Sequence, residues 1–505
     1  SSCQPLALCS IRRDAPARMA PPCDGSTGAG LFRGAPIIVH GLQNGTEYNG
    51  RKGMVSSELH ENGRYEVTIE TGEASSKDRK VLALRSTNLR LDMEALTEFL
   101  SQRRAEKRPS RNPPLEDVAV FWTKGHGLSG KSLKLHEAPV PELEAGQVLL
   151  RVEKFGLSHM ALSYLAKGFT RTFGAYHNFF PCMDESFYRS GCWGYASVVE
   201  SDHPKVAVGT RLYGLFPPCR YVTQEIAGVI PPGRNGEPAR VEFPSKGLAF
   251  NLRRFREYEV VEASSCDASD PALEDWKIAT KELYTMGFYM DEQLLVDTGM
   301  INSAIISCAS AKTALALAFC LRMRGMRHVI GVTSAEHADF TRSTDLYHEV
   351  VSYEDVASLP ADRTVVLLDF RCDRELREAV AARMGTRLMY AIVVGPAVFQ
   401  KQATDQLFEK RVREVLFDEA TWRERRRIVA EVTKTGRDEK LQHSYAPFVE
   451  RMRQHIRLKH VSGRAAFIEF YERIYNGAAP PSEAYIFSLH EDTDDPNVDE
   501  FWKAA

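Results

Sequence analysis

The feature that most constrains the fold is an alternation of short apolar runs with helix-like segments between residues 302 and 394. Runs such as 302–309 (NSAIISCA) and 364–370 (TVVLLDF) have cores made almost entirely of apolar residues, and helix-like segments such as 311–326 follow them. Strands that are apolar along their length and alternate with helices form a parallel sheet covered on both faces. The sequence therefore predicts a doubly wound α/β domain of the Rossmann type in this region.

The turn after the first of these strands, residues 307–314, consists of small residues apart from Lys312. In such sheets this turn opens a helix, whose free N–H groups and partial positive charge bind phosphate. Small residues such as Ala311 let the backbone approach the phosphate closely, and Ser310 and Thr313 add hydroxyl groups. We therefore predict a dinucleotide site here, although the turn lacks GxGxxG. A parallel sheet that binds no nucleotide stays open as the alternative.

The end of the second strand carries Thr333 and Ser334, where an Asp or Glu would bind the ribose hydroxyls of NAD. Hydroxyl groups in place of a carboxylate remove repulsion toward a 2′-phosphate. Lys312, His337 and Arg342 are candidates to pair with that phosphate. The sequence thus predicts NADP(H), rather than NAD(H), as the cofactor.

The first 116 residues divide into three segments. Residues 1–34 have the Ser-, Ala-, Pro-, Gly- and Arg-rich composition of either a disordered tail or an organellar transit remnant. Residues 35–92 contain short strands separated by Asn-Gly and Gly turns, which predicts a small β-barrel, and their order resembles SH3-like barrels. Residues 93–116 are predicted as a helix and a proline-rich linker.

A β-rich block, in which Gly and Pro residues separate the strand-like segments, begins at about residue 117. The motifs FGLS, FFPC and SCASAKTALALA, together with residues 193–217 and 467–489, resemble the zinc-free, quinone-oxidoreductase-like branch of the medium-chain dehydrogenase/reductases. The similarity extends over about 120–490 and is greatest to an uncharacterised branch, so it implies a fold and a cofactor class but no substrate. It implies a GroES-like substrate domain at 117–285, a Rossmann domain at 286–455 and a return to the first block, with a tail, at 456–505.

The resemblance also implies site residues. Tyr164 is the predicted proton donor, and Ser158 and Tyr213 lie on segments that line the cleft in relatives. Asp369 is predicted either to hydrogen-bond near the cofactor or to cap the following helix. The positions expected close to the nicotinamide are Thr285, Val394, Gly395 and Phe487.

No catalytic metal is expected. Zinc-dependent relatives use a Cys at the position of Ser158 and a His-Glu pair where this chain has Cys192, Trp193, Gly194 and Tyr195. A catalytic zinc needs three protein ligands and an open site, and these residues do not supply them.

Composition excludes some partners. The net charge of −2 does not favour nucleic acid or an anionic membrane, and no run approaches the ~20 apolar residues needed to span a bilayer. Ten scattered cysteines with no CxxC pair favour a reducing compartment, either the cytoplasm or an organelle such as a plastid. The resemblance implies a small-molecule substrate and a homodimer.

Two functions compete at this point. The first is an NADPH-dependent, zinc-independent oxidoreductase that transfers hydride to a quinone, an enone or another activated carbonyl. The second is a non-catalytic or NADPH-sensing scaffold that holds protein partners through residues 35–92. Both predictions depend on the turn at 307–314.

Overall fold

The computed structural model divides into two compact units, residues 1–108 and 109–505, which are described separately. The residues that the structure describes are 31, 35–57, 64–70, 79–92, 95, 116–123, 132–167, 176–180, 186–233, 238–248, 250–261, 270, 272–298, 301–394, 413–416, 425 and 439–490. The predicted tail at 1–34 and helix and linker at 93–116 lie almost entirely outside this set.

The first unit contains one five-stranded antiparallel sheet in the order β4-β3-β2-β1-β5. Its strands are β1 (Pro36–Val39), β2 (Lys52–Val55), β3 (Arg64–Glu70), β4 (Arg79–Arg85) and β5 (Leu89–Leu91). Ile37, Val39, Val67 and Ile69 form its own buried core. The pairings among described residues leave β4 and β5 as edges and do not close a barrel. The SH3-like assignment therefore stays a prediction.

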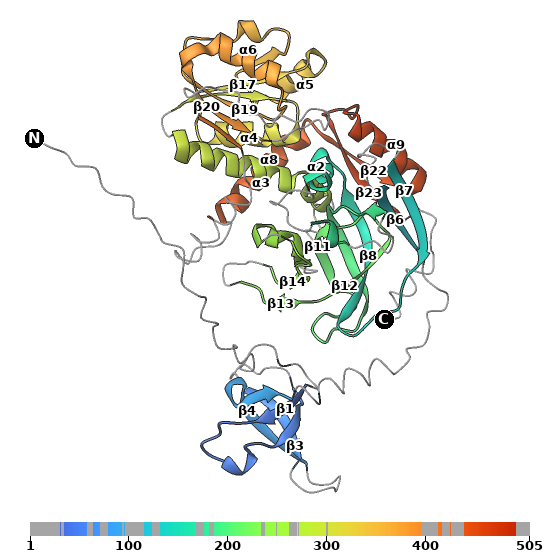
Figure 1. Ribbon diagram of the computed structural model, residues 1–505. Coiled ribbons are helices and arrows are strands. Elements are labelled where there is room, and N and C mark those ends of the chain that lie inside the picture. Colours follow the sequence, from blue (N-terminus) through green and yellow to red (C-terminus); the bar gives the residue numbers. More distant parts are fainter. Residues whose placement is uncertain are drawn as a thin grey trace, which may run out of the picture. The chain divides into compact units, whose positions relative to one another are not determined.

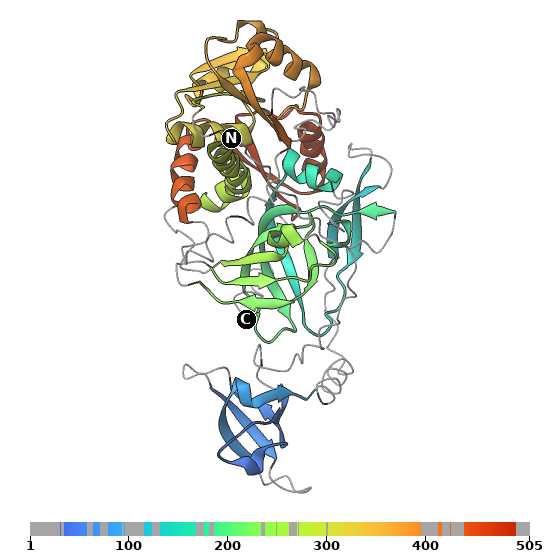
Figure 2. The same ribbon diagram turned by 60° about the vertical axis from the view of Figure 1, so that its left-hand side comes forward.

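The second unit contains a nine-stranded sheet in the order β13-β14-β15-β11-β10-β8-β23-β22, with β12 also paired to β8. The strands are β8 (Gln147–Gly156), β10 (Cys192–Ser201), β11 (Arg211–Phe216), β12 (Tyr221–Glu225), β13 (Gly228–Ile230), β14 (Arg240–Glu242), β15 (Glu257–Val261), β22 (Arg457–Ser462) and β23 (Glu483–Ser488). The C-terminal β23 pairs antiparallel to β8, with Phe487 opposite Phe155. The red C-terminal strands in Figure 2 therefore belong to the same sheet as strands from residues 147–261.

A three-stranded sheet, β7-β6-β9, packs with this block. Its strands are β6 (Glu116–Thr123), β7 (Leu133–Pro139) and β9 (Phe187–Tyr188). The buried Trp122 of β6 donates from Nε1 to the Tyr471 hydroxyl at 2.8 Å. Tyr471 lies on α9 (Arg464–Tyr475), so this contact joins the sheet to the C-terminal segment.

The second unit also holds a six-stranded parallel sheet in the order β18-β17-β16-β19-β20-β21. Its strands are β16 (Ser303–Ser307), β17 (His328–Thr333), β18 (Glu349–Ser352), β19 (Val365–Asp369), β20 (Leu388–Val393) and β21 (Arg413–Leu416). Numbered along the chain, this is the order 3-2-1-4-5-6 of a Rossmann sheet, with its reversal between β16 and β19. The predicted fold class is confirmed.

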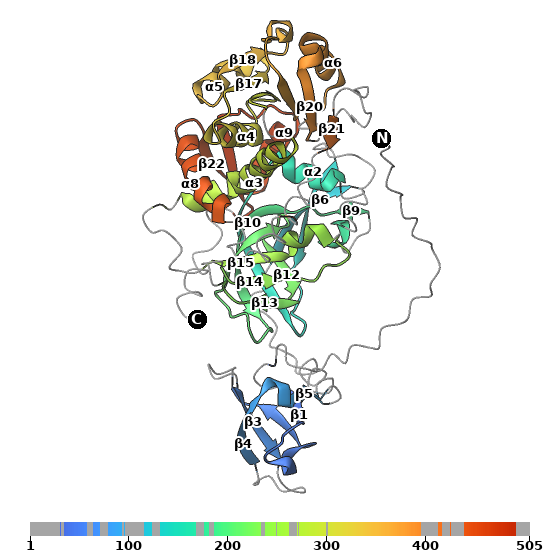
Figure 3. The same ribbon diagram turned by 90° about the vertical axis from the view of Figure 1, so that its left-hand side faces the viewer.

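Helices cover both faces of the parallel sheet (Figures 1 and 3). Alternate residues of β16 point to opposite faces, as strand geometry requires. Ala304 and Ile306 pack with α3 (Leu273–Thr298), α4 (Lys312–Met323) and α8 (Glu439–Arg453), whereas Ile305 packs with α6 (Arg374–Met384). The described residues also include the helices α2 (His159–Lys167) and α5 (Ala338–Ser343). None of the helices among the described residues is both long and apolar enough to cross a membrane.

Helix α3 belongs to the cores of both parts of this unit. Tyr284 packs in the core of the parallel sheet, while Ile278 packs in the aromatic cluster of the β-rich block. At Gly156 of β8 an added Cβ would lie 2.6 Å from Ile278 Cγ2, so only glycine permits this close approach. The predicted boundary between residues 285 and 286 falls inside this continuous helix.

Candidate functional site

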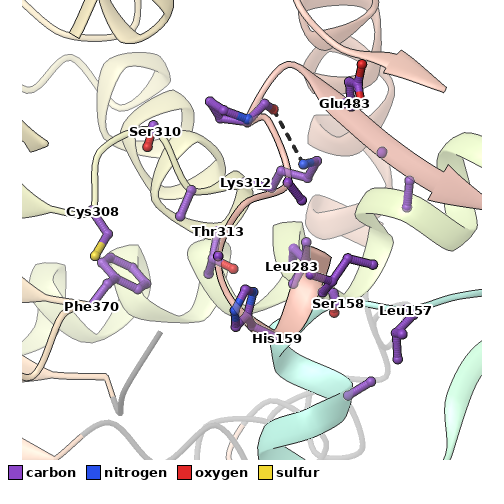
Figure 4. A pocket seen from close by; sticks show the side chains of 18 of the residues that line it. Leu157, Ser158, His159, Leu283, Cys308, Ser310, Lys312, Thr313, Phe370 and Glu483 are labelled. Atoms are coloured by element: carbon purple, nitrogen blue, oxygen red, sulfur yellow. Dashed lines mark hydrogen bonds between the residues drawn. The ribbon is translucent and has the colours of Figure 1, made fainter. Parts of the chain in front are cut away.

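A cavity of about 560 Å³ lies at the carboxyl ends of the parallel strands. Residues that follow five successive strands line it: Cys308 after β16, Ser334 after β17, Tyr353 after β18, Phe370 after β19 and Val394 after β20. Ligands of open α/β sheets bind in this crevice, beside the point where the strand order reverses. The opposite wall comes from α2, α3 and the loop before β23, as Figure 4 shows in part.

The turn between β16 and α4 forms the floor of the cleft. Its first residue, Cys308, has a φ of 49°, in the left-handed region, and its N–H donates to the Tyr353 hydroxyl at 3.2 Å. The Tyr347 hydroxyl donates to the Ala309 carbonyl at 2.8 Å, which fixes the next peptide. Tertiary contacts therefore hold a conformation for which a glycine is the usual choice.

Ala311 is the N-cap residue of α4, and no side chain caps the helix. The first amide groups of α4 thus lack a side-chain acceptor, which leaves them available to an anion. All four predicted turn residues line the cleft, namely Ser310, Ala311, Lys312 and Thr313. Thr333 at the end of β17 also lines it and donates to the Ser310 hydroxyl at 3.3 Å.

Lys312 is a half-buried cation in the cleft wall. Its Nζ donates to the Pro481 carbonyl at 3.4 Å, and it makes no ion pair with any residue that the structure describes. Desolvation lowers the pKa of Lys312 to about 8, although Glu483 opposes this effect. Burial, together with the charge of Lys312, lowers the pKa of His159 across the cleft.

The end of the cleft near β17 and β18 carries hydroxyl groups and cations. Ser334, His337, Tyr353 and Arg371 line it. The Arg371 guanidinium lies 4.2 Å from the ring centre of Tyr353, and its Nε pairs with Asp373 at 2.8 Å. Arg342, the other predicted phosphate partner, is exposed, pairs with Asp339 and is not among the lining residues.

The wall formed by the β-rich block is mainly apolar. Leu157, Trp193, Ile278 and Leu283 line it, with Glu282 as its acidic member. The indole Nε1 of Trp193 is buried and has no hydrogen-bond partner among the described residues. This wall suits an apolar, planar small molecule that can accept a hydrogen bond.

One of the three predicted catalytic residues lines the cleft, and the other two do not. Ser158 lines the cleft, but Tyr164 and Tyr213 do not. The Tyr164 hydroxyl accepts from Arg254 at 3.1 Å, and its ring packs on Phe255. Tyr213 is buried in the same aromatic cluster, where burial raises its pKa well above the usual value. Neither phenol is placed to reach a substrate in this cleft.

The positions predicted beside the nicotinamide also differ in whether they line the cleft. Val394 lines the cleft, and Gly395 lies outside the described residues. Thr285 is buried and donates to the Lys281 carbonyl, while Phe487 stacks on Phe155 in the core. The side chains of Thr285 and Phe487 therefore contact other groups of the protein and do not line the cleft.

Asp369 is fully buried and does not line the cleft. Its Oδ1 accepts from the Ser307 hydroxyl at 2.8 Å and from the amides of Arg371 and Cys372. The alternative that Asp369 caps the next helix is wrong, because Asp373 is the N-cap residue of α6. Asp369 instead ties the ends of β16 and β19 together beneath the cleft.

Several residues that line the cleft were not among the site residues predicted from the sequence. In the sequence, His159 is an isolated histidine with no motif around it. Trp193 stands out only because it lies in the segment where zinc-dependent relatives have their His-Glu pair. Tyr353 and Arg371 follow strands β18 and β19, so the rule that ligands bind at carboxyl ends of strands could have identified them. Glu282 and Glu483 carry no comparable sequence signal.

Among the residues that the structure describes, no group of three His, Cys, Asp or Glu side chains could hold a metal ion. A zinc-independent site stays a prediction that rests on Ser158 and Trp193.

Comparisons with known proteins give one family and a set of distant structures. The model of the family described as "Protein of unknown function (DUF2855)" matches residues 155–480, more than half of the chain. No curated protein matches the sequence. The structure of CurA from Vibrio vulnificus in complex with NADPH is similar with a TM-score of 0.46 and 13% identity, covering 75% of this chain and 100% of that one. A quinone oxidoreductase from Coxiella burnetii has a TM-score of 0.44 and 13% identity, covering 74% and 99%.

Proposed function

This chain belongs to the DUF2855 family, and we propose that it is an NADPH-dependent, zinc-independent reductase of quinones, enones or other activated carbonyls. The observation that carries the proposal is the cleft itself. An uncapped helix N-terminus at the switch point of a Rossmann sheet faces an apolar wall with an unpaired indole N–H. One side suits a dinucleotide and the other a small planar substrate.

The residues present fit NADPH. The amides of Ser310, Lys312 and Thr313 would hold its pyrophosphate, and Val394 would pack near its nicotinamide end. Ser334, His337 and Arg371 would hold the adenosine end with its 2′-phosphate. When bound, NADPH supplies a hydride. The protein orients the acceptor on the wall of Leu157, Trp193 and Leu283 and excludes water around it.

The test is NADPH oxidation by the full-length protein against a panel of quinones and enones, together with calorimetric titration of NADPH and NADH. We expect tighter binding of NADPH and turnover with at least one acceptor. Tighter binding of NADH would contradict the cofactor assignment. NADPH binding without turnover of any acceptor would contradict the reductase.

A Ser334→Asp variant is expected to reverse the cofactor preference. Its carboxylate would repel the 2′-phosphate and accept from ribose hydroxyls, so we expect NADPH affinity to fall about 100-fold, or about 2.7 kcal/mol. NADH affinity should hold or rise. Ser358→Asp on the exposed surface is the matched control and should change neither affinity. Equal losses for both cofactors in Ser334→Asp would show that Ser334 does not face the 2′-position.

A second candidate function is a scaffold or an NADPH sensor that binds a protein through residues 35–92. The observation in its favour is that this segment has its own sheet and core within a separate compact unit. Deleting residues 1–116 should then abolish partner capture while leaving NADPH binding unchanged. Capture of the same partners by the truncated chain would contradict this role.

A further inference from the structure

Lys312 is the feature of the cleft that nucleotide binding does not require. The backbone of the turn and of α4 suffices to bind a pyrophosphate, so the ammonium group has no necessary part there. A cation that lines a cleft without an ion pair is costly unless a ligand supplies an electron-rich partner. Among the residues that the structure describes, Lys312 Nζ has one hydrogen bond, the long one to the Pro481 carbonyl.

The ammonium group lies toward the β-rich wall. Its neighbours there are Pro481 and Glu483, from the loop and strand of the C-terminal return, and His159 from α2. Figure 4 shows Lys312 on the side of the turn toward Glu483 and away from Cys308, with a dashed line for its hydrogen bond to the Pro481 carbonyl. The adenosine end, beside Thr333 and Ser334, is bordered instead by His337, Tyr353 and Arg371. Lys312 therefore faces the region where the hydride acceptor would bind.

We propose that Lys312 is the catalytic proton donor, which hydrogen-bonds the carbonyl oxygen of the acceptor and protonates it. This inference rests on the proposed reductase function and replaces the phenol of Tyr164, which lies outside the cleft. Lys312 would touch the substrate through Nζ, in the place now taken by the Pro481 carbonyl.

The proposed step transfers a hydride and a proton to the acceptor. Hydride from NADPH forms a C–H bond at the carbonyl carbon or at the β-carbon of an enone, and NADPH is oxidised to NADP⁺. The electron pair of the reduced π-system moves to oxygen, which takes a proton from the Lys312 ammonium to give the alcohol or enol. Neutral Lys312 then regains a proton from solvent. Stabilising the developing oxyanion and delivering the proton are both tasks for a cation in a dry cleft.

The surrounding charges permit this role. Glu483 is already engaged by Lys459 at 2.6 Å and by the Tyr485 hydroxyl at 2.5 Å, and Glu282 of α3 pairs with Arg254. His159 is neutral near pH 7, because its pKa is lowered. With a Lys312 pKa of about 8, the ammonium form predominates below that pH and is lost above it. The hydride-transfer rate should therefore fall as pH rises through about 8.

The first experiment compares Lys312→Met and Lys312→Arg with the wild type at saturating NADPH. We expect the single-turnover rate of Lys312→Met to fall about 100-fold, with NADPH affinity close to that of the wild type. Lys312→Arg should recover part of the rate and lose the decline above pH 8, because a guanidinium stays protonated. Lys205→Met, at an exposed turn, is the control and should keep both rate and pH profile. Weaker NADPH binding with an unchanged rate at saturation would overturn the proposal and assign Lys312 to the phosphates.

The second experiment does not depend on turnover. Benzaldehyde condenses with a neutral amine, and cyanoborohydride reduces the resulting imine to a stable adduct that mass spectrometry can locate. At pH 8 the full-length protein should be labelled at Lys312 before its exposed lysines, since a larger fraction of Lys312 is neutral. Cyclohexenone should slow this labelling, whereas adenosine 2′-monophosphate, which carries no phosphate of the pyrophosphate and fills only the adenosine end, should not.

The outcomes separate the two proposals. Selective labelling that cyclohexenone slows, without turnover of any acceptor, would support a carbonyl site at Lys312 while contradicting the reductase. Turnover that survives in Lys312→Met with its pH dependence intact would contradict the proton donor alone. Protection by adenosine 2′-monophosphate would place Lys312 at the adenosine end and overturn the inference whatever the activity.

Discussion

An Ala311→Asp variant is expected to be more stable than the wild type and yet to lose about 10³-fold in NADPH affinity. Ala311 has the extended backbone of an N-cap residue but offers no side-chain acceptor to the amides of α4. Aspartate is among the preferred N-cap residues, and an alanine there costs about 1 kcal/mol by comparison. The variant should therefore unfold at a higher temperature in the absence of nucleotide.

The same carboxylate would occupy the place of the pyrophosphate. It would satisfy the amides that we assign to phosphate, and it would set a negative charge against the anion at a cost of about 4 kcal/mol. Differential scanning fluorimetry and calorimetric titration would measure the two effects. Ala311→Asn is the matched control, because it caps the helix without a charge and should weaken NADPH less. A gain in stability with unchanged NADPH affinity would show that the nucleotide does not rest on this turn.

An Asp369→Ala variant is expected to destabilise the parallel sheet by about 3–5 kcal/mol. Asp369 is fully buried, and its Oδ2 lies 3.5 Å from Nε of the equally buried Arg377. Removing the carboxylate takes this buried counter-charge away from Arg377 and removes an acceptor from the Ser307 hydroxyl and from the Cys372 amide, while the Arg371 amide keeps Ser307 Oγ as its second acceptor. Because Phe370 and Arg371 follow directly and line the cleft, NADPH affinity should fall as well.

Urea unfolding followed by circular dichroism would measure this loss. Asp362→Ala is the control, because the Asp362 carboxylate pairs with Arg363 at the exposed surface and its removal should barely change the free energy of unfolding. Similar unfolding midpoints for the two variants would mean that the Asp369 carboxylate does not hold the strand ends together.

The parallel sheet was predictable because its evidence is local. Apolar runs of strand length, such as Val365–Leu368, separated by segments of helical period, leave few arrangements other than a doubly wound sheet. The same applies to the position of the turn at residues 307–314, because small residues directly after the first strand lie at a position that the fold itself defines. Ser310, Lys312 and Thr333 line the cleft as a result.

Which side chains of the β-rich block line the cleft was not predictable in this way. Tyr164 and Ser163 are neighbours on α2, yet only Ser163 lines the cleft, because successive helical residues point about a quarter of a turn apart. Tyr213 and Trp193 lie on paired strands and pack together, but only Trp193 reaches the cavity. Which member of each pair is available to a ligand depends on packing partners such as Phe255, far away in sequence.

The amino-acid pattern thus determined the parallel sheet, its doubly wound type and the position of the turn at residues 307–314. These features follow from the spacing of apolar and small residues along the chain. The tertiary structure alone decided which side chains meet across the cleft. Lys312 reaches Pro481 and Glu483 only because the C-terminal β23 returns to pair with β8. Such an encounter joins residues about 170 positions apart, and its geometry comes from the packing of whole elements rather than from any local periodicity.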